Sequence, residues 1–254
     1  MYVRPKKNLG QHFLVDKNIA SKIVDSLHAN ETKDIIEIGP GTGVLTRFLM
    51  QRKNLNLTLI EIDRESVAYL NLEFPEMKNQ ILEADFLKMD SKKLFETKKS
   101  IIGNFPYNIS SQIFFKVLEF KNQVPEVVCM IQKEVAERIA TKPGSKAYGI
   151  LSVFLQAFYD IEYLFTVSET VFNPPPKVKS AVIRLTRNKV EKLDCDEKLF
   201  VQVVKTAFNQ RRKTLSNSLK SFHFENKTEI EMLQLRAERL SVADFVYLTN
   251  LIVV

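Results

Sequence analysis

The chain has few of the features that mark secreted, metal-binding or membrane proteins. Its only two cysteines, Cys129 and Cys195, are far apart and belong to no His/Cys cluster, which argues against a disulfide framework and a zinc site. It has no long uncharged apolar run, so no membrane span is expected. The basic N-terminus has no apolar signal core behind it. We therefore expect a cytoplasmic protein without a bound metal.

Acidic residues are outnumbered by basic ones. Lys and Arg total 37 against 30 Asp and Glu, giving a formal net charge of +7 and a sequence pI near 9.2. This excess makes a polyanionic partner plausible, although many basic proteins bind none. Hydrophobic residues make up 45% of the 254, which is enough for a sizeable core.

Apolar runs alternate with helical periodicity through the first two thirds of the chain. The runs at 34–38, 57–62, 80–82, 100–102 and 127–131 predict strands, and 43–53, 64–74 and 109–120 predict helices. This alternation is typical of an α/β fold with a mainly parallel sheet covered by helices on both faces. Two later strand-like runs, 161–167 and 180–185, have no clear helix between them and predict an antiparallel edge.

The pattern changes near Asn188. Between Asp196 and the apolar C-terminal residues no strand pattern appears, while residues 200, 203, 204, 207 and 208 place apolar side chains on one helical face. Ser241 is a suitable N-cap for a last helix through Ile252. We expect a first domain over residues 1–188 and a small helical domain over 189–254.

A glycine-rich turn follows the first predicted strand, with Gly39, Gly41 and Gly43 at alternate positions. Glycines let a turn bend tightly and let a ligand approach the backbone. The spacing differs from the G-x-G-x-x-G of dinucleotide folds, and a turn without a ligand is an equally good interpretation of the motif alone.

Two carboxylates follow the next two strands. Glu61 can accept hydrogen bonds from both hydroxyls of a ribose, and Asp85 can accept one from an adenine amino group. Each has a plainer interpretation, a solvated strand end for Glu61 and a turn cap for Asp85. Because carboxyl ends of strands bind ligands in open α/β sheets, the three features together favour a nucleoside cofactor. S-adenosylmethionine fits better than NAD, since the glycine spacing is wrong for a pyrophosphate.

The tetrapeptide Asn104-Phe105-Pro106-Tyr107 follows the fourth predicted strand. The Asn104 side-chain oxygen and the Phe105 carbonyl can accept both N–H groups of an exocyclic amine, which localises the nitrogen lone pair for attack on a methyl group. Pro106 biases Phe105 towards an extended conformation, and Tyr107 can stack on an extruded base. A simple turn is the alternative. Because this tetrapeptide follows a cofactor motif in the chain, we favour a catalytic role for it, in methyl transfer to the amino group of a nucleobase.

Further candidates lie towards the C-terminus. Phe172, before three prolines, is either a second aromatic wall beside the base or a core side chain next to a stiff linker. Arg211, Arg212 and Lys213 form a basic run that either contacts RNA phosphates or is a solvated face.

In order along the chain, these motifs resemble the KsgA (RsmA) family of ribosomal RNA adenine dimethyltransferases. The matching segments are 10–14 (GQHFL), 37–46 (EIGPGTGVLT), 61–63 (EID), Asp85, 104–110 (NFPYNIS), Phe172 with 176–180, and 208–215 (FNQRRKTL). The resemblance implies a Rossmann-like methyltransferase domain with a small helical C-terminal domain. It also implies that positions 12, 14, 39, 61, 85 and 104 (His12, Leu14, Gly39, Glu61, Asp85 and Asn104) contact S-adenosylmethionine.

The resemblance further implies the substrate, two adjacent adenosines in the 3′-terminal hairpin loop of 16S ribosomal RNA, each of which receives two methyl groups. We expect a monomer with a role in small-subunit biogenesis. His12 replaces the family's usual Asn, which puts a side-chain contact at that position in question, and Phe105 replaces Leu or Ile. The alternatives are an Erm-type 23S ribosomal RNA methyltransferase, which the methyltransferase core cannot distinguish, and a mainly non-catalytic ribosome-assembly factor.

Overall fold

The computed structural model describes residues 3–253. Met1, Tyr2 and Val254, the outermost residues of the two expected domains, lie outside the described residues. The chain divides into two compact units. The first runs up to Ala136 and resumes over Asp160–Arg187, and the second contains Glu137–Tyr159 and the residues from Asn188 onward. No helix within residues 3–253 is long and apolar enough to cross a membrane.

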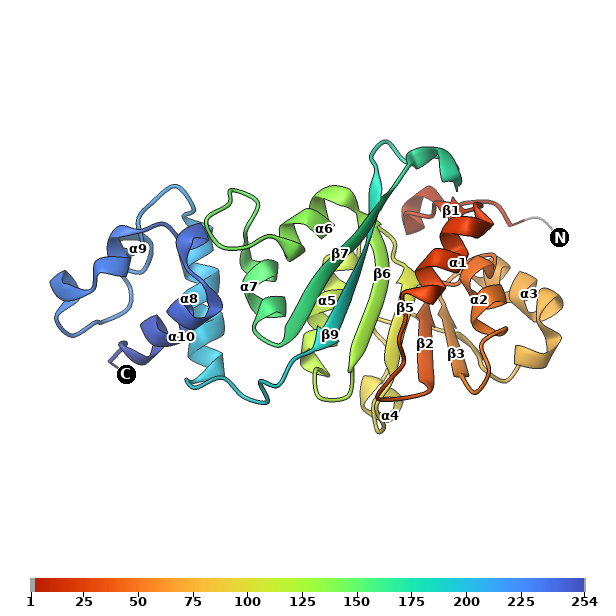
Figure 1. Cartoon of the computed structure of the whole chain (residues 1–254), viewed down its shortest axis with the longest axis horizontal. Helices are drawn as coiled ribbons and strands as arrows, with labels where there is room; N and C mark the ends of the chain where they lie inside the picture. The colour runs from red at the N-terminus through yellow and green to blue at the C-terminus, as the bar shows by residue number, and fades with distance from the viewer. Residues whose placement is uncertain (1–2, 254) are drawn as a thin grey trace. The chain divides into compact units, whose positions relative to one another are not determined.

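A seven-stranded sheet forms the first unit (Figure 1). Its strand order is β4-β3-β2-β5-β6-β9-β7, and β4, β3, β2, β5 and β6 are parallel. Their bounds are β2 Asp34–Ile38, β3 Asn56–Glu61, β4 Ile81–Glu83, β5 Ser100–Asn104 and β6 Glu126–Gln132. The predicted parallel sheet is confirmed, and the carboxyl ends of five strands meet at one edge.

The predicted antiparallel edge is also confirmed. β9 (Ser180–Arg187) runs antiparallel to β6, and β7 (Tyr159–Val167) lies beyond it. A separate two-stranded antiparallel sheet joins β1 (Phe13–Leu14) to β8 (Phe172–Asn173). This small sheet brings the start of the chain to a segment about 160 residues later.

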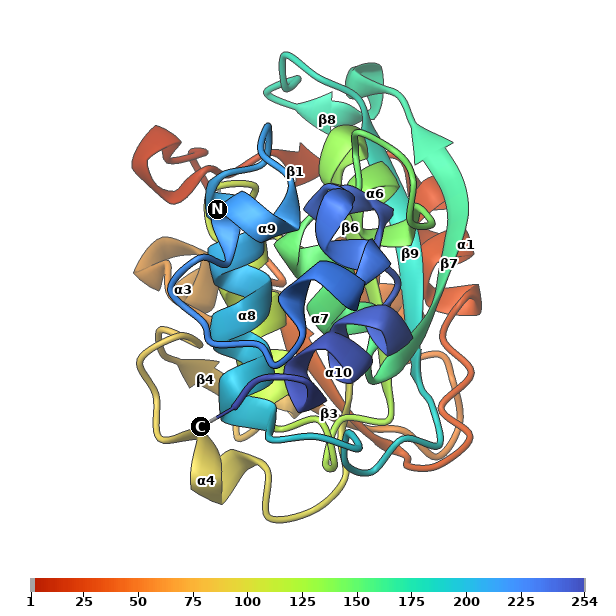
Figure 2. The same ribbon diagram turned by 90° about the vertical axis from the view of Figure 1, so that its left-hand side faces the viewer.

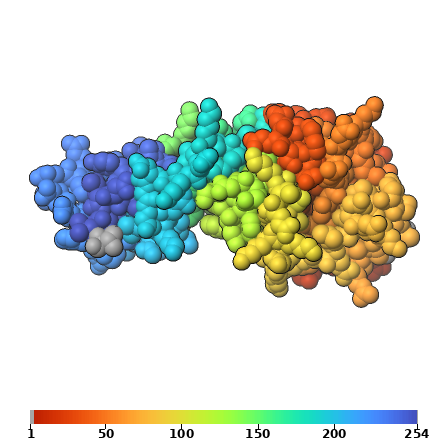
Figure 3. All heavy atoms as spheres, turned by 90° about the horizontal axis from the view of Figure 1, so that it is seen from below, coloured from red at the N-terminus to blue at the C-terminus, as the bar shows by residue number. Residues whose placement is uncertain are grey.

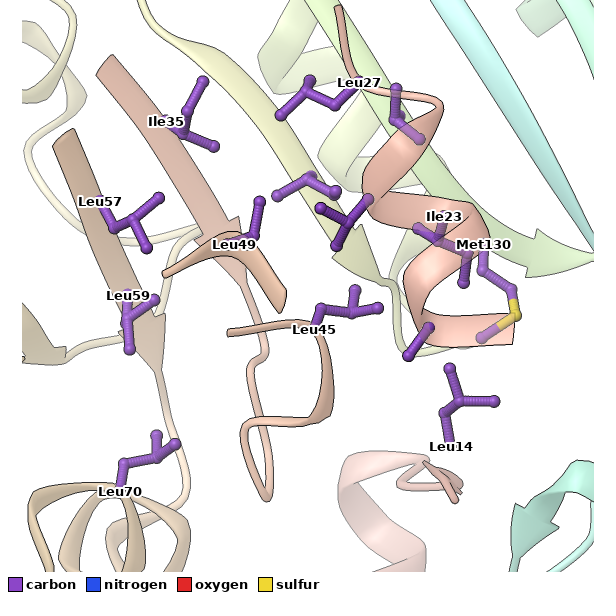
Figure 4. Close-up of a cluster of buried hydrophobic side chains, with 14 of the residues drawn as sticks. Leu14, Ile23, Leu27, Ile35, Leu45, Leu49, Leu57, Leu59, Leu70 and Met130 are labelled. Atoms are coloured by element: carbon purple, nitrogen blue, oxygen red, sulfur yellow. The ribbon is translucent and has the colours of Figure 1, made fainter. Parts of the chain in front are cut away.

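Helices α1 (Lys17–Asp25), α2 (Val44–Leu49) and α3 (Arg64–Glu73) cover one sheet face and share a single core with it. In Figure 4, Ile23 of α1, Leu45 and Leu49 of α2 and Leu70 of α3 gather over Ile35, Leu57 and Leu59 of the sheet. The helix expected over 43–53 is shorter than predicted. The chain turns after Leu49 to enter β3, with Asn54 in a left-handed conformation (φ 66°).

Further helices and turns complete this unit. They are α4 (Ser91–Leu94), α5 (Ser110–Glu119), the first part of α6 (Lys133–Ala140), and the 3-10 turns η1 (Lys7–Leu9), η2 (Pro75–Met77) and η3 (Glu169–Val171). Asp16, Asp63 and Asp90 cap α1, α3 and α4 by accepting backbone N–H groups.

The second unit is mainly helical. In Figure 2, α7 (Ile150–Gln156) lies beside α8 (Glu197–Asn209) and α10 (Val242–Asn250). Four of the five apolar side chains predicted for one face of α8 are buried, and Ser241 caps α10 as predicted. The remaining elements are α9 (Leu215–Ser218), η4 (Lys227–Glu229), η5 (Glu231–Gln234) and η6 (Ala237–Arg239).

Residues 137–159 pack with this C-terminal unit, although the sequence pattern places them in the first domain. The apolar side chains of α7 explain the difference, because Leu151, Val153 and Leu155 are buried and Phe154 packs on Phe200 of α8 with ring centroids 6.1 Å apart. A helix after a strand continues an α/β pattern in the sequence, but its burial partner here is a helix about 45 residues later.

Candidate active site

The turn after β2 holds its three glycines at positive φ angles. Gly39 and Gly41 have φ angles of +67° and +56°, a region that side chains rarely allow. A Cβ at Gly41 would lie 2.8 Å from the Phe13 ring, so the N-terminal segment could not close over the turn. A Cβ at Gly39 would meet nothing closer than Pro106 at 4.0 Å, so it would occupy open space beside the turn. The glycines thus keep a cradle clear.

A pocket of about 720 Å³, open to solvent, lies over this turn. The pocket brings together nine of the predicted site residues: His12, Gly39, Gly41, Glu61, Asp85, Asn104, Phe105, Pro106 and Tyr107. Gly39, Glu61, Asp85 and Asn104 come from the carboxyl ends of four parallel strands or directly after them, as the sequence predicts.

Glu61 is buried and locked in place by the backbone. Its two carboxylate oxygens accept hydrogen bonds from the N–H groups of Gly41 and Asp63, each at 2.9 Å. Burial raises the pKa of Glu61, and these two backbone donors oppose the rise. The carboxylate therefore holds the glycine turn against β3 and presents a fixed acceptor to the pocket.

Asp85 lies in the loop after β4. One of its carboxylate oxygens accepts the backbone N–H of Leu87 at 2.9 Å, and the other lies 3.6 Å from Lys88 Nζ. Asp85 is thus both the turn cap that the sequence allows and a pocket-lining carboxylate.

Asn104 ends β5, and its side-chain orientation is set by the N-terminal segment. Its Nδ2 donates to the backbone carbonyl of His12 at 3.0 Å. A carbonyl oxygen only accepts, so the amide NH₂ must face His12, and Oδ1 is left as the acceptor. The Phe105 side chain is buried and packs against Phe114, so only its backbone is available to a ligand. An amide oxygen and a neighbouring carbonyl suit an amine donor.

Tyr107 and His12 form the outer wall. Their rings stack with centroids 5.6 Å apart at an interplanar angle of 25°. The Tyr107 hydroxyl lies 2.5 Å from Ser180 Oγ, and His12 Nδ1 lies 2.8 Å from the Pro174 carbonyl oxygen. Burial raises the pKa of Tyr107, and the Ser180 contact opposes this. The His12 side chain is therefore engaged by Tyr107 and Pro174, and its carbonyl by Asn104.

Leu14 and Phe172 do not line this pocket. They face each other in the β1–β8 pair and are both buried in the hydrophobic core. Leu14 lines a smaller adjoining pocket of about 280 Å³, together with Gly39, Gly41 and Asn104. The position of Phe172 favours a core side chain over an aromatic wall in this structure.

The basic run lies in the other unit. The Arg211 guanidinium donates to the backbone carbonyls of Lys146 and Tyr148, the latter at 2.9 Å. Arg212 and Lys213 are exposed. Arg211 thus holds the loop between α6 and α7. The structure gives it a role in the protein itself that its two neighbours do not share.

Sequence reasoning did not single out Glu37 as a site residue. It is 1% exposed, lines the smaller pocket and accepts a hydrogen bond from Thr46 Oγ1 at 2.6 Å. Burial raises its pKa to about 8, while the Thr46 hydrogen bond opposes this and the Glu61 charge adds to it. An acidic residue inside the otherwise apolar run 35–38 is the sequence feature that marks it.

Comparison with known proteins decides the family. Residues 3–252 match the family model described as "Ribosomal RNA adenine dimethylase". The chain belongs to the ribosomal RNA adenine dimethylase family. A relative from Parabacteroides distasonis, "Ribosomal RNA small subunit methyltransferase A", is 58% identical over 249 residues, covering 97% of this chain and 93% of the relative. The chain is therefore an enzyme, a methyltransferase whose cofactor is S-adenosylmethionine.

Two solved structures confirm the fold. A dimethyladenosine transferase from Plasmodium falciparum is similar with a TM-score of 0.79 and 24% identity, covering 95% of this chain and 99% of that one. The 23S rRNA methyltransferase ErmE is similar with a TM-score of 0.73 and 23% identity, covering 94% and 99%. Both likenesses show the Rossmann-like methyltransferase fold. The pocket fits the cofactor of this family, because its glycine cradle is clear and the carboxylates of Glu61 and Asp85 line it.

Proposed function

We propose that this dimethylase transfers methyl groups from S-adenosylmethionine to N6 of two adjacent adenosines in the 3′-terminal hairpin loop of 16S ribosomal RNA. The product at each position is N6,N6-dimethyladenosine. The small-subunit assignment is supported by the name of the Parabacteroides distasonis relative at 58% identity. The likeness to ErmE carries no substrate information, because at 23% identity it concerns the fold alone.

The observation that carries the catalytic proposal is the hydrogen bond from Asn104 Nδ2 to the His12 carbonyl. It leaves Asn104 Oδ1 and the Phe105 carbonyl as the two acceptors for the adenine amino group. Accepting both N–H groups concentrates the nitrogen lone pair towards the methyl carbon, which the bound cofactor supplies as an electrophile. These dipoles are preorganised, so they need no rearrangement as charge develops on the nitrogen.

Tyr107 provides the surface on which the extruded adenine stacks. Its ring already stacks on His12, and the Ser180 contact fixes the ring's hydroxyl end. Aromatic stacking is worth about 1–3 kcal/mol per base and tolerates an added methyl group, which a second transfer to the same nitrogen requires. In this proposal Phe172 acts from the core, where it supports β1 behind the wall.

At the other sites, Glu61 binds the cofactor ribose and Asp85 its adenine amino group. His12, Leu14, Gly39 and Gly41 shape the same site, and Arg212 and Lys213 contact RNA phosphates. The enzyme acts as a cytoplasmic monomer during small-subunit biogenesis.

One experiment tests the substrate assignment. Purified protein is incubated with methyl-labelled S-adenosylmethionine and, separately, with small and large ribosomal subunits that lack adenine dimethylation. Mass spectrometry of the digested RNA then maps the product. We expect label in two adjacent dimethyladenosines of the small subunit. Label confined to the large subunit would establish the Erm-type alternative, and only monomethyladenosine after exhaustive reaction would contradict dimethylation.

A further inference from the structure

The loop after β4 forms one wall of the pocket and is tied down by a lysine from another element. Ala84, Asp85 and Phe86 of this loop, residues 84–89, line the pocket. Lys116 lies in the middle of α5 and does not line it. Its Nζ donates to the carbonyls of Phe86, Leu87 and Met89 at 2.6, 3.1 and 3.3 Å.

The Lys116 ammonium group uses all of its hydrogen-bond donors in this contact. An ammonium group has three N–H donors, and three loop carbonyls accept from Lys116. Its Nζ also lies 5.3 Å from the centroid of the Phe86 ring, within the range of a cation–π contact. In Figure 3 the yellow surface segment that includes this part of the chain adjoins the yellow-green residues of α5. A single side chain thus holds three carbonyl groups of the loop backbone.

Lys116 lies on the helix that follows the Asn104–Tyr107 segment and contacts the loop that carries Asp85. α5 begins at Ser110, three residues after the Asn104–Tyr107 segment, and the 84–89 loop carries Asp85. Within the loop, Asp85 is held only locally, by the N–H of Leu87 and by the exposed Lys88. The backbone N–H of Ala84 ties the start of the loop to the Glu61 carbonyl at 2.9 Å, and Lys116 holds the rest of the loop from α5.

We propose that Lys116 is a positioning residue that holds the 84–89 loop so that Asp85 accepts the adenine amino group of the cofactor. This rests on the role of Asp85 in the proposed function. Without the anchor, the loop would relax and Asp85 would lose its fixed distance from the amino group. The cofactor would still bind through Glu61 and the glycine turn, but recognition of its base would weaken.

The test compares two ligands by calorimetry, which needs no turnover. One is S-adenosylmethionine and the other is its inosine counterpart, in which an oxygen replaces the adenine amino group. The wild-type protein should prefer the adenine form by about 10- to 100-fold, the worth of a hydrogen bond to a charged acceptor. Lys116→Met, which keeps the side-chain length and removes the donors, should lower this ratio to less than about threefold.

Matched variants separate positioning from general destabilisation. Lys116→Arg keeps several donors and should retain most of the discrimination. Lys33→Met removes another lysine that donates to a backbone carbonyl, that of Ala29 at 2.8 Å, and should leave the ratio unchanged. If Lys116→Met does not fold, Lys116→Gln, which keeps two of the donors, replaces it and should give an intermediate ratio.

The results on Lys116 and Asp85 variants distinguish a failure of the proposed role of Lys116 from a failure of the proposed role of Asp85. A wild-type ratio in folded Lys116→Met, together with a collapsed ratio in Asp85→Ala, would overturn the role of Lys116 alone. A wild-type ratio in Asp85→Ala would remove the premise that Asp85 recognises the adenine. In the Asp85→Ala background, Lys116→Met should change the ratio no further, and an additional loss there would also contradict positioning through Asp85.

Discussion

The side-chain Nδ2 of Asn104 lies 3.0 Å from the backbone carbonyl of His12, 92 positions earlier in the chain. This hydrogen bond determines which atom of the amide faces the acceptor base. It also means that the residue type at position 12 matters less for Asn104 than the path of the backbone there. The replacement of the family's usual Asn by His is therefore compatible with the same amide orientation.

Asn104→Ala should fold and bind S-adenosylmethionine but transfer methyl groups about 100- to 1000-fold more slowly, because a preorganised polar contact is lost. Asn104→Asp should be at least as slow, since a carboxylate cannot donate to the His12 carbonyl and would rotate or repel it. Single-turnover rates and cofactor affinity are the measurements. Gln112→Ala, on the exposed side of α5, is the control. Near-normal turnover in Asn104→Ala would rule out the proposed polarising role.

Glu61→Ala should weaken S-adenosylmethionine binding by about 2–4 kcal/mol, because two hydrogen bonds from the ribose to a charged acceptor are lost. Glu61→Gln should also weaken it, since its NH₂ group would face the N–H of Gly41 or Asp63. Calorimetry on both variants measures the effect, with urea unfolding as the check on folding. Unchanged affinity in a folded variant would remove Glu61 from the site.

The three basic residues at 211–213 should differ in effect. Arg212→Ala and Lys213→Ala should each lower the log–log salt slope of RNA binding by about 0.7–0.9, the value of one phosphate contact. Arg211→Ala should instead mainly destabilise the loop that it holds through Lys146 and Tyr148. Filter binding across a salt series and urea unfolding distinguish the two effects. Wild-type slopes in both Arg212→Ala and Lys213→Ala would make them solvated charges.

Phe172→Ala tests the two interpretations of that residue. A core phenylalanine should cost about 3–5 kcal/mol of unfolding free energy when truncated. An aromatic wall in the pocket would instead weaken capture of the target adenosine with little loss of stability. Tyr107→Ala is the comparison, because it should weaken RNA capture while the cofactor affinity stays nearly intact. Wild-type stability in Phe172→Ala would contradict the core assignment.

Glu37 should make stability depend on pH. Its pKa is raised to about 8 in the folded protein, against an ordinary value of 4.5, so the folded state binds the proton more tightly. The stability it contributes is fully present below about pH 4.5 and is lost as the pH rises towards 8, by a few kcal/mol. Glu37→Gln cannot ionise, so its stability relative to wild type should rise between pH 5 and 8. Parallel urea curves at all pH values would contradict this.

Local signals in the sequence predicted most of the first unit. The apolar runs and the glycine turn define β2, β3, β5 and β6 and the edge where their ends meet, so Glu61, Asp85 and Asn104 could be grouped before the structure was known. Each of these signals lies within a few residues of the element that it predicts. Ser241 could be predicted as the N-cap of α10 for the same reason.

Long-range partners could not be predicted in this way. Phe172 has the same local sequence whether it faces solvent or Leu14, and the choice depends on a strand pair joining distant segments. The apolar pattern of α7 predicts burial but not that α8 covers it. Arg211 likewise lies in a basic run typical of RNA contacts, but its guanidinium donates to the carbonyls of Lys146 and Tyr148, about 65 positions earlier in the chain.

The pairing of β1 with β8 also sets an order of events during synthesis. Phe13 and Leu14 leave the ribosome early, but their strand partners, Asn173 and Phe172, are made about 160 residues later. At roughly 5–20 residues per second, the N-terminal segment waits about 10–30 s before this partner exists. The nascent enzyme thus has its five parallel strands and its glycine turn before it can close the N-terminal wall of its cofactor site. A newly made copy becomes able to hold its methyl donor only when most of its first unit has been translated.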